Sequence, residues 1–412
     1  MSKLKAVKLF YDNGILTLDN NERIKINKLI ITTDDDDGII LNTDLCLNNK
    51  RIKCLADPID DNDVVTKHKI DEIINAGVGG NISTNNSDDP LYYNRAFIAG
   101  GNSDDSGRRS MYDIIQIVHV GNIDNSVLYG HLEVPRSSMA GTSNGRNGKA
   151  ILFGGTWCDY SIPRCYSQNE IQSINMSLNN GNGEIIGNLD GPRTFDQNAA
   201  SSNGTDNNAF LVSGWYNYIY SDQIVKYDIN DINNSSLFAT MEKPWSRPTS
   251  SNGKNGIMGM FGGFYKSGTR YLTAEIKYFN MYNFTDINLF GELIRPNVSA
   301  NTVSDDTNNR VIIAGGFQVS PATRFDEIQI VVLINPSDAV MFGKLETKLR
   351  AMASNSNGTG EYAEFDGGST NSGIDTTHRR ILNFTTPSNS SIFSELSYGV
   401  IYMSGNMSTS LQ

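Results

Sequence analysis

The chain has 412 residues, of which only 38% are hydrophobic and 19% charged, and it is rich in Gly (38) and Asn (48), which disfavour helices and favour turns. Its 9% of aromatic residues argues against a disordered chain, and its net charge of −11 argues against nucleic acid as a main partner. Many short strands joined by polar turns are the fold class that remains.

The first 85 residues carry short strand patterns with turn signals, namely KAVKLFYDNGILTL, RIKINKLIITT and DDDDGIILN. The acidic run 34–37 before Gly38 lacks the alternating oxygen ligands and later Glu of a calcium loop, so we interpret it as a solvated turn. Further on, Asn62 or Asp63 can cap a short helix over VVTKHKIDEII, in which Val65, Ile70, Ile73 and Ile74 form one apolar stripe. A helix this short needs a packing partner, and a second copy of the chain is one candidate.

Part of this segment resembles a motif of phage tail-fibre and baseplate-associated proteins, of the form I-x-x-L-x-D-P-x-x-D-x-D-A-x-x-K-x-Y-V-D. The matching positions are Ile52, Leu55, Asp57, Pro58, Asp61, Asp63, Lys67 and Asp71. Val64 replaces the usual Ala, and Lys69-Ile70 replaces the Tyr-Val pair. The resemblance implies that residues 1–85 are an attachment or oligomerisation segment of a virion fibre, in which three chains wind together.

Residues 86–412 contain an internal repeat of about 50 residues. Each unit has an SNG-like element, a short apolar run, a Gly-Gly doublet, a second strand pattern and an FG-L element, as in SNGKNGIMGMFGG followed by EIKYFNM and LFGEL. In five units the third residue of the SNG element precedes the doublet by nine positions. The doublet glycines are Gly100, Gly101, Gly154, Gly155, Gly214, Gly262, Gly263, Gly315, Gly316, Gly367 and Gly368, with Ser213 in the first position of one doublet.

Such units predict an all-β fold, a β-propeller of six four-stranded blades, because a lone four-stranded sheet cannot bury both faces and stacking on neighbours does so. We assign the doublets to strand ends that meet the central channel, where a Cβ would obstruct the backbone. A β-solenoid or a row of separate small sheets is the alternative. A seventh blade stays open, because the C-terminal VIYMSGN can begin another unit that the N-terminal segment completes.

The pattern resembles the kelch repeat, and more closely the kelch-like repeats of large phages and giant viruses, which carry SNG, FGG and FG-L elements in the same order. The resemblance covers roughly residues 90–405, although the regular Trp of cellular kelch repeats is missing. It implies a propeller and says little about activity, since propellers host many functions.

Aromatic residues follow several doublets, at equivalent positions that would share one rim of the propeller. A glycan could stack on them, or they could fill gaps between blades. These candidate ligand-binding residues are Trp157, Trp215, Tyr216, Phe264, Tyr265 and Phe317.

The sequence contains no metal, phosphate-loop or nucleophile signature, so we expect no cofactor and no catalysis. An arginine recurs near the unit ends, where it could cap carbonyl groups or, in a sialidase-like enzyme, converge with others; these are Arg136, Arg193, Arg247, Arg295 and Arg350. A copper oxidase is disfavoured by the four scattered His. Cys158 and Cys165 can close a loop in an oxidising setting, and the sequence leaves their state open.

The sequence analysis therefore predicts a virion structural protein that is made in the host cytoplasm. The chain shows neither a signal-peptide pattern nor an apolar run of the roughly 18 residues needed to span a bilayer. We expect residues 1–85 to bind other virion proteins, with a homotrimer as one option, and the propeller to bind a host glycan or protein receptor. A cellular kelch-type adaptor and a propeller enzyme of sialidase or oxidase type are the alternatives.

Overall fold

The computed structural model divides the chain into two compact units, Met1–Ser83 and Thr84–Gln412. It describes residues 9–12, 15–18, 95–103, 110–143, 148–159, 164–189, 199–202, 207–212, 214–216, 219–246, 248–252, 255–267, 269–283, 286–305, 307–357, 360–372 and 374–398. All of the secondary structure in these residues consists of strands, turns and bends. Among the described residues there is no helix with the length and hydropathy to span a lipid bilayer.

The described part of the first unit is one antiparallel hairpin. Strands β1 (Leu9–Asp12) and β2 (Ile15–Leu18) pair with Asp12 opposite Ile15, as the Asp-Asn-Gly turn signal predicts. The other N-terminal features lie outside the described residues: the acidic turn at 34–38, the predicted helix over 64–74 and the fibre-type motif at 52–71.

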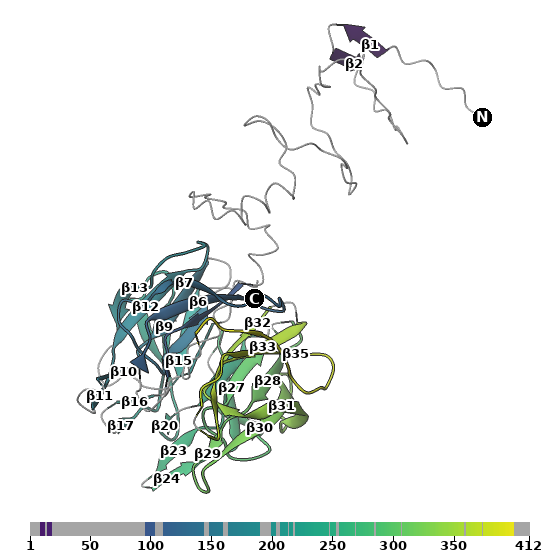
Figure 1. Cartoon of the computed structure of the whole chain (residues 1–412). Coiled ribbons are helices and arrows are strands. Elements are labelled where there is room, and N and C mark those ends of the chain that lie inside the picture. Colours follow the sequence, from purple (N-terminus) through teal and green to yellow (C-terminus); the bar gives the residue numbers. More distant parts are fainter. Residues whose placement is uncertain are drawn as a thin grey trace. The chain divides into compact units, whose positions relative to one another are not determined.

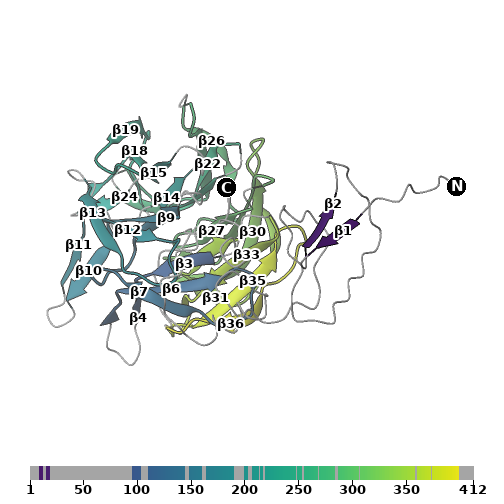
Figure 2. The ribbon, with the colours of Figure 1, turned by 90° about the horizontal axis from the view of Figure 1, so that it is seen from above.

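The second unit is a β-propeller of six small antiparallel sheets, which confirms the predicted fold class (Figures 1 and 2). Blade 1 has three described strands, β3 (Arg95–Ala99), β6 (Ile114–His119) and β7 (Val127–His131). Each later blade has four strands in the order of the chain. The innermost strands of blades 2 to 6 are β8 (Ala140–Ser143), β14 (Ala199–Ser202), β21 (Thr249–Asn252), β27 (Asn301–Ser304) and β32 (Ala353–Ser356).

The second strands carry the apolar run of each repeat, and the third and fourth strands follow it. The second strands of blades 2 to 6 are β9 (Lys149–Phe153), β15 (Asn208–Val212), β22 (Ile257–Phe261), β28 (Arg310–Ala314) and β33 (Tyr362–Asp366). The third strands are β12 (Glu170–Asn175), β18 (Gln223–Asp228), β25 (Glu275–Asn280), β30 (Thr323–Val332) and β35 (His378–Asn383). The fourth strands are β13 (Glu184–Asn188), β19 (Ser235–Thr240), β26 (Asn288–Glu292), β31 (Val340–Arg350) and β36 (Ser391–Glu395).

The core is a series of clusters between successive blades, because each sheet buries both faces against its neighbours. Phe97 and Ile115 of blade 1 pack against Ala150 and Leu152 of blade 2, and equivalent clusters follow between each later pair. The innermost strands contact one another in turn from β8 to β32. They consist largely of small polar residues that are buried, and Ser354 Oγ donates to the carbonyl oxygen of Thr302 in the preceding blade (2.8 Å).

The doublet glycines end the second strands, and all eleven have positive φ, between 56° and 134°. Their neighbours lie where one blade leads into the next: a Cβ on Gly315 would lie 2.5 Å from the carbonyl oxygen of Leu349, at the end of β31, and one on Gly262 would lie 2.5 Å from that of Asn297, in the linker after β26. The crowding that we assigned to the central channel therefore comes from the chain that leads to the next blade. The second N–H of the doublet also bonds this part of the chain, as from Gly316 to Leu349 (2.8 Å).

Blade 6 meets blade 1 at the point where the ring closes. Ser126 N donates to Glu395 O (3.1 Å), and Ser397 N donates to Ser126 Oγ (2.7 Å). The propeller thus has six blades, and the C-terminal VIYMSGN pattern lies outside the described residues.

Candidate functional site

Short hairpins and strands directly follow the glycine doublets, and they form the candidate site. Because every blade has the same strand order, the connection between its second and third strands leaves on the same face of the propeller. The hairpins of blades 2, 3 and 4 gather on one side in Figure 1. These elements are β4 (Asn102–Ser103), β5 (Ser110–Met111), β10 (Thr156–Asp159), β11 (Arg164–Ser167), β16 (Trp215–Tyr216), β17 (Ile219–Tyr220), β23 (Phe264–Ser267), β24 (Thr269–Leu272), β29 (Phe317–Gln318) and β34 (Ser369–Thr370).

The hairpin of blade 2 presents an aromatic pair. Cys158 faces Cys165 across β10 and β11, and the two form a disulfide. The next pair in register is Trp157 and Tyr166, whose rings stack at a centroid distance of 5.8 Å and an interplanar angle of 25°. Trp157 is half-buried and Tyr166 is 42% exposed, so this pair offers aromatic surface to solvent on a covalently closed hairpin.

The aromatic residues that follow the doublet of blade 4 are buried, in contrast with the pair of blade 2. Phe264 is 4% exposed and Tyr265 1% exposed. Tyr265 packs on Trp245 of β20 (Trp245–Ser246) at 5.2 Å between ring centroids and donates to Glu275 Oε2 at 2.6 Å. Burial, and next the hydrogen bond to Glu275, raise the pKa of the Tyr265 hydroxyl. The alternative interpretation of gap-filling between blades describes Tyr265, which belongs to the cluster between blades 3 and 4. Because both rings are buried, neither offers a face to a sugar.

Phe317 in blade 5 is half-buried, and the guanidinium of Arg350 lies 4.7 Å from its ring centroid. Trp215 and Tyr216 form β16 and pair with Tyr220 and Ile219 in β17. Their side chains are outside what the structure describes.

Sequence reasoning missed two tyrosines on these hairpins, Tyr166 and Tyr271, which is 43% exposed in β24. The sequence WCDYSIPRCY contains the signal for Tyr166: Trp157 comes directly before the first cysteine, and Tyr166 comes directly after the second. Two cysteines opposite each other in a hairpin bring these flanking residues face to face.

The recurrent arginines that the structure describes have different surroundings. Arg136, 1% exposed, donates from Nη1 to the carbonyl oxygen of Gly154 in the next blade (3.1 Å), and burial lowers its pKa. Arg295 pairs instead with Glu327 (2.8 Å) and is 44% exposed. Arg193 and Arg247 lie outside the described residues, and the part of the chain that is described holds no group of three His, Cys, Asp or Glu side chains suited to a metal ion.

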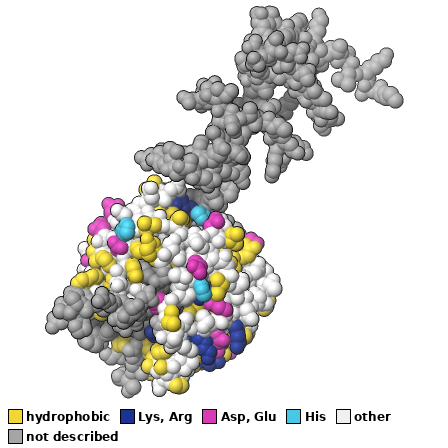
Figure 3. Space-filling view, in the orientation of Figure 1, with side chains coloured by type: hydrophobic (Ala, Val, Ile, Leu, Met, Phe, Trp, Pro, Cys, Tyr) yellow, Lys and Arg dark blue, Asp and Glu magenta, His cyan; other side chains and the backbone are white. Residues whose placement is uncertain are grey.

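The surface visible in Figure 3 carries hydrophobic side chains in scattered small groups among uncharged polar ones. Neither positive nor negative side chains form a broad patch on this face. This face therefore presents uncharged hydrogen-bonding groups and separate hydrophobic side chains rather than one charged or apolar patch. No protein-family model matches the sequence, and comparison with curated proteins finds no significant relative.

Proposed function

We propose that this protein is a non-catalytic virion component whose propeller binds a host-surface glycan through the hairpin face. The observation that carries the proposal is the stacked pair of Trp157 and Tyr166 on the disulfide-closed hairpin of blade 2. An exposed aromatic face stacks on the apolar face of a sugar ring, and the many Ser, Thr and Asn side chains supply hydrogen bonds to hydroxyl groups.

The virion part of the proposal is supported by the fibre-type motif at 52–71 and by the kelch-like repeat of viral type. Residues 1–85 would attach the protein to other virion proteins. Light scattering tests this attachment role: the full chain is expected to be a trimer, and a variant that begins near residue 85 a monomer. If both were monomers, the fibre-type assignment of residues 1–85 would be rejected, and only the propeller fold would remain.

Glycan binding is tested on an array with the full chain, followed by titration calorimetry on the glycans that bind. Trp157→Ala is expected to weaken binding about tenfold or more, because a stacked ring contributes about 0.5–1.5 kcal/mol beyond the area it buries. Tyr282→Ala is the matched control. Tyr282 is 52% exposed and follows the third strand of blade 4, so it lies on the opposite face.

Two outcomes would redirect the proposal. Binding to a purified protein and to no glycan would favour the kelch-type adaptor. Turnover in a glycosidase or oxidase screen would favour a propeller enzyme and would contradict the non-catalytic role.

A further inference from the structure

Five of the six contacts between blades have an apolar pair at the end of the second strand. The last residue before the doublet pairs with a buried isoleucine of the third strand, and both side chains face the next blade. The register pairs are Ala99 with Ile115, Phe153 with Ile171, Val212 with Ile224, Phe261 with Ile276, and Ala314 with Ile328.

Blade 6 has charged residues at these positions. Asp366 pairs with Arg379, and Glu364 lies two residues before Asp366 on the same face of β33. Glu364 and Asp366 are 0% exposed and Arg379 is 1% exposed. Arg379 Nε lies 2.6 Å from Glu364 Oε1 and 3.7 Å from Asp366 Oδ1. This ionic triad of Glu364, Asp366 and Arg379 thus occupies the place of the apolar pairs elsewhere.

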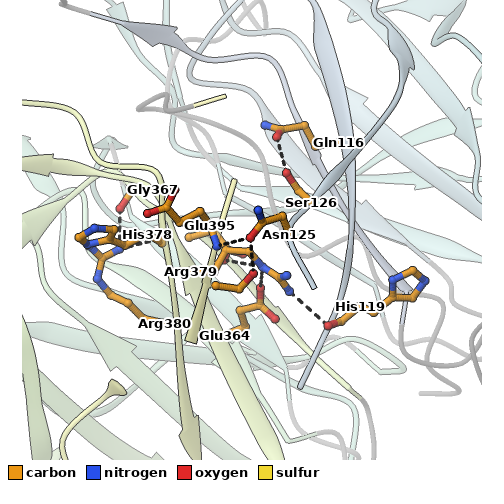
Figure 4. A network of polar contacts seen from close by, with 12 residues as sticks. Gln116, His119, Asn125, Ser126, Glu364, Gly367, His378, Arg379, Arg380 and Glu395 are labelled. Carbon is orange, nitrogen blue, oxygen red and sulfur yellow. Dashed lines mark hydrogen bonds and ion pairs between the residues drawn. The ribbon is translucent and has the colours of Figure 1, made fainter. Parts of the chain in front are cut away.

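Glu364 and Arg379 of the ionic triad lie at the seam where the ring closes (Figure 4). Arg379 reaches across to blade 1 and donates to the carbonyl oxygens of His119 (3.2 Å) and Asp124. Ser394 Oγ, from β36, donates to the same carbonyl of Asp124 (2.8 Å). The apolar cluster at this seam is small; its members are Ala96, Ile98, Val118, Val120, Ala353 and Leu396, with Tyr112 and Tyr362 beside them. Arg379 therefore joins the two ends of the ring, and its orientation depends on its carboxylate partners.

The triad has one more negative charge than positive charge when both carboxyl groups are ionised. Asp366 gains no hydrogen bond to either oxygen from the described donors, and Glu364 Oε2 gains none. Arg380, on the other face of β35, is paired with Glu346 at 2.6 Å. Blade 1 contributes to this seam the backbone carbonyls of His119 and Asp124, the apolar side chains of the small cluster, and the uncharged polar side chains of Gln116, Asn125 and Ser126. Burial first, and then the charge of Glu364, raise the pKa of Asp366 well above its usual value, against the opposing effects of Arg379 and Arg380.

We propose that protonation of the Glu364–Asp366 pair controls the strength of the contact between blades 6 and 1. The contact is tightest when the pair holds one proton, and it loosens when both carboxyl groups are ionised. An unpaired charge in a water-excluded contact is costly, and the protonated pair removes it. The other five contacts are apolar at this position, so a change of pH that acts through this position affects one seam of the ring.

The sign of the effect follows from linkage. An Asp whose pKa is higher in the folded than in the unfolded protein holds its proton more tightly when folded. Its contribution to stability is fully present below the unfolded pKa of about 3.9, and it is lost as the pH rises through the folded pKa. The seam is thus strongest in acid and weakens toward neutral and alkaline pH.

The test measures the melting temperature of the full chain from pH 4.5 to 9 for the wild type and for Asp366→Asn, which mimics the protonated acid. Asp366→Asn is expected to melt about 2–4 °C above the wild type at pH 8, and this difference is expected to shrink toward pH 4.5. Glu292→Gln removes one negative charge from an exposed side chain of β26 and serves as the control, with no pH-dependent difference.

A melting temperature of Asp366→Asn below that of the wild type at pH 8, or a difference that does not change with pH, would overturn the proposal. Glu364→Gln gives a second check, because Asp366 can then ionise as the counterion of Arg379. Its destabilisation is expected to be smaller at pH 8 than at pH 4.5, and the reverse trend would also count against a shared proton.

Hydrogen exchange measured by mass spectrometry locates the effect. After correction for intrinsic rates, peptides that cover 119–131 and 391–398 are expected to exchange faster at pH 8 than at pH 5 in the wild type and equally in Asp366→Asn. Peptides from the contact between blades 2 and 3 provide the internal reference. Equal changes in both regions would indicate a global effect and would reject a local seam.

Discussion

Arg136 links two successive glycine doublets. Its carbonyl oxygen accepts a hydrogen bond from Gly101 N in blade 1 (2.8 Å), and its Nη1 donates to the carbonyl oxygen of Gly154 in blade 2 (3.1 Å). Asn297 has the same place between blades 4 and 5, where its backbone accepts from Gly263 (2.7 Å) and its side chain donates to Gly315 O (2.8 Å). The linker between blades is therefore held by one residue that bonds the doublets on both sides.

Arg136→Ala is expected to destabilise the propeller by about 2–4 kcal/mol, because it leaves Gly154 O without this donor and removes the 3.4 Å contact with Glu170 Oε2 from a buried site. Urea unfolding at neutral pH measures the loss. Arg295→Ala is the control: its side chain is 44% exposed, so removing it is expected to cost only about 0–1 kcal/mol. Equal losses in the two variants would refute a special role for the buried arginine.

Gly315→Ala tests the doublet. The backbone at Gly315 has φ of +64°, and an added Cβ would lie 2.5 Å from Leu349 O. The left-handed conformation costs about 1–2 kcal/mol for Ala, and the clash with backbone adds about 1–3 kcal/mol. Gly183→Ala is the comparison, because Gly183 has no positive φ and its Cβ would meet side-chain atoms first, Gln172 Oε1 at 3.1 Å and Leu132 Cδ2 at 3.2 Å. The prediction is contradicted if the two variants unfold at the same urea concentration.

The spacing of the repeat was sufficient to predict the blades, since the doublets and the FG-L elements mark strand ends whatever residues lie between them. The role of individual side chains was harder to predict. Phe264 and Trp157 both follow a doublet, yet Phe264 is buried and Trp157 is half-exposed. In blade 4 the linker strand β20 pairs with β23 over two residues and places the ring of Trp245 against Tyr265. In blade 2 the linker makes a single bridge at this place, between Ser137 and Thr156, and the repeat pattern does not predict this difference.

The charged seam was visible in the sequence as an exception to the pattern. The run YAEFDGG places Glu364 and Asp366 where other units have apolar residues, and Arg379 stands where the others have Ile. Sequence alone cannot tell which partners bury these charges, because their neighbours in blade 1 are more than 200 residues away. Only the closed ring brings Arg379 to the carbonyl oxygen of His119.

Reduction of the disulfide is expected to open the blade 2 hairpin without unfolding the propeller. β10 and β11 form a two-stranded sheet of their own, so the Cys158–Cys165 bond stabilises mainly this local element. Trypsin cleavage after Arg164 is expected to become faster on the order of tenfold with reductant, while the melting temperature of the core changes little. Cleavage after Arg270, in the hairpin of blade 4, should be the same with and without reductant. A large drop in melting temperature would contradict this local role.

The fourth strand of blade 1 is expected to come from the C-terminal segment. In blades 2, 4, 5 and 6 the innermost strand begins eight residues after the Leu or Met that ends the preceding FG-L element, as Ala140 follows Leu132. The same distance from Leu396 leads to Ser404, and Ser404-Gly405-Asn406 has the small polar composition of the innermost strands.

Deleting residues 399–412 is therefore expected to lower the melting temperature by about 5 °C or more, because β3 would keep an unpaired edge beside the seam. Deleting residues 1–93, which precede β3 in the sequence, is expected to leave the melting temperature nearly unchanged. Calorimetry of the two variants and of the full chain shows whether the C-terminal or the N-terminal segment supplies the fourth strand of blade 1. If the N-terminal deletion were the destabilising one, the strand that completes blade 1 would have to precede Arg95, and the ring would close without its C-terminus.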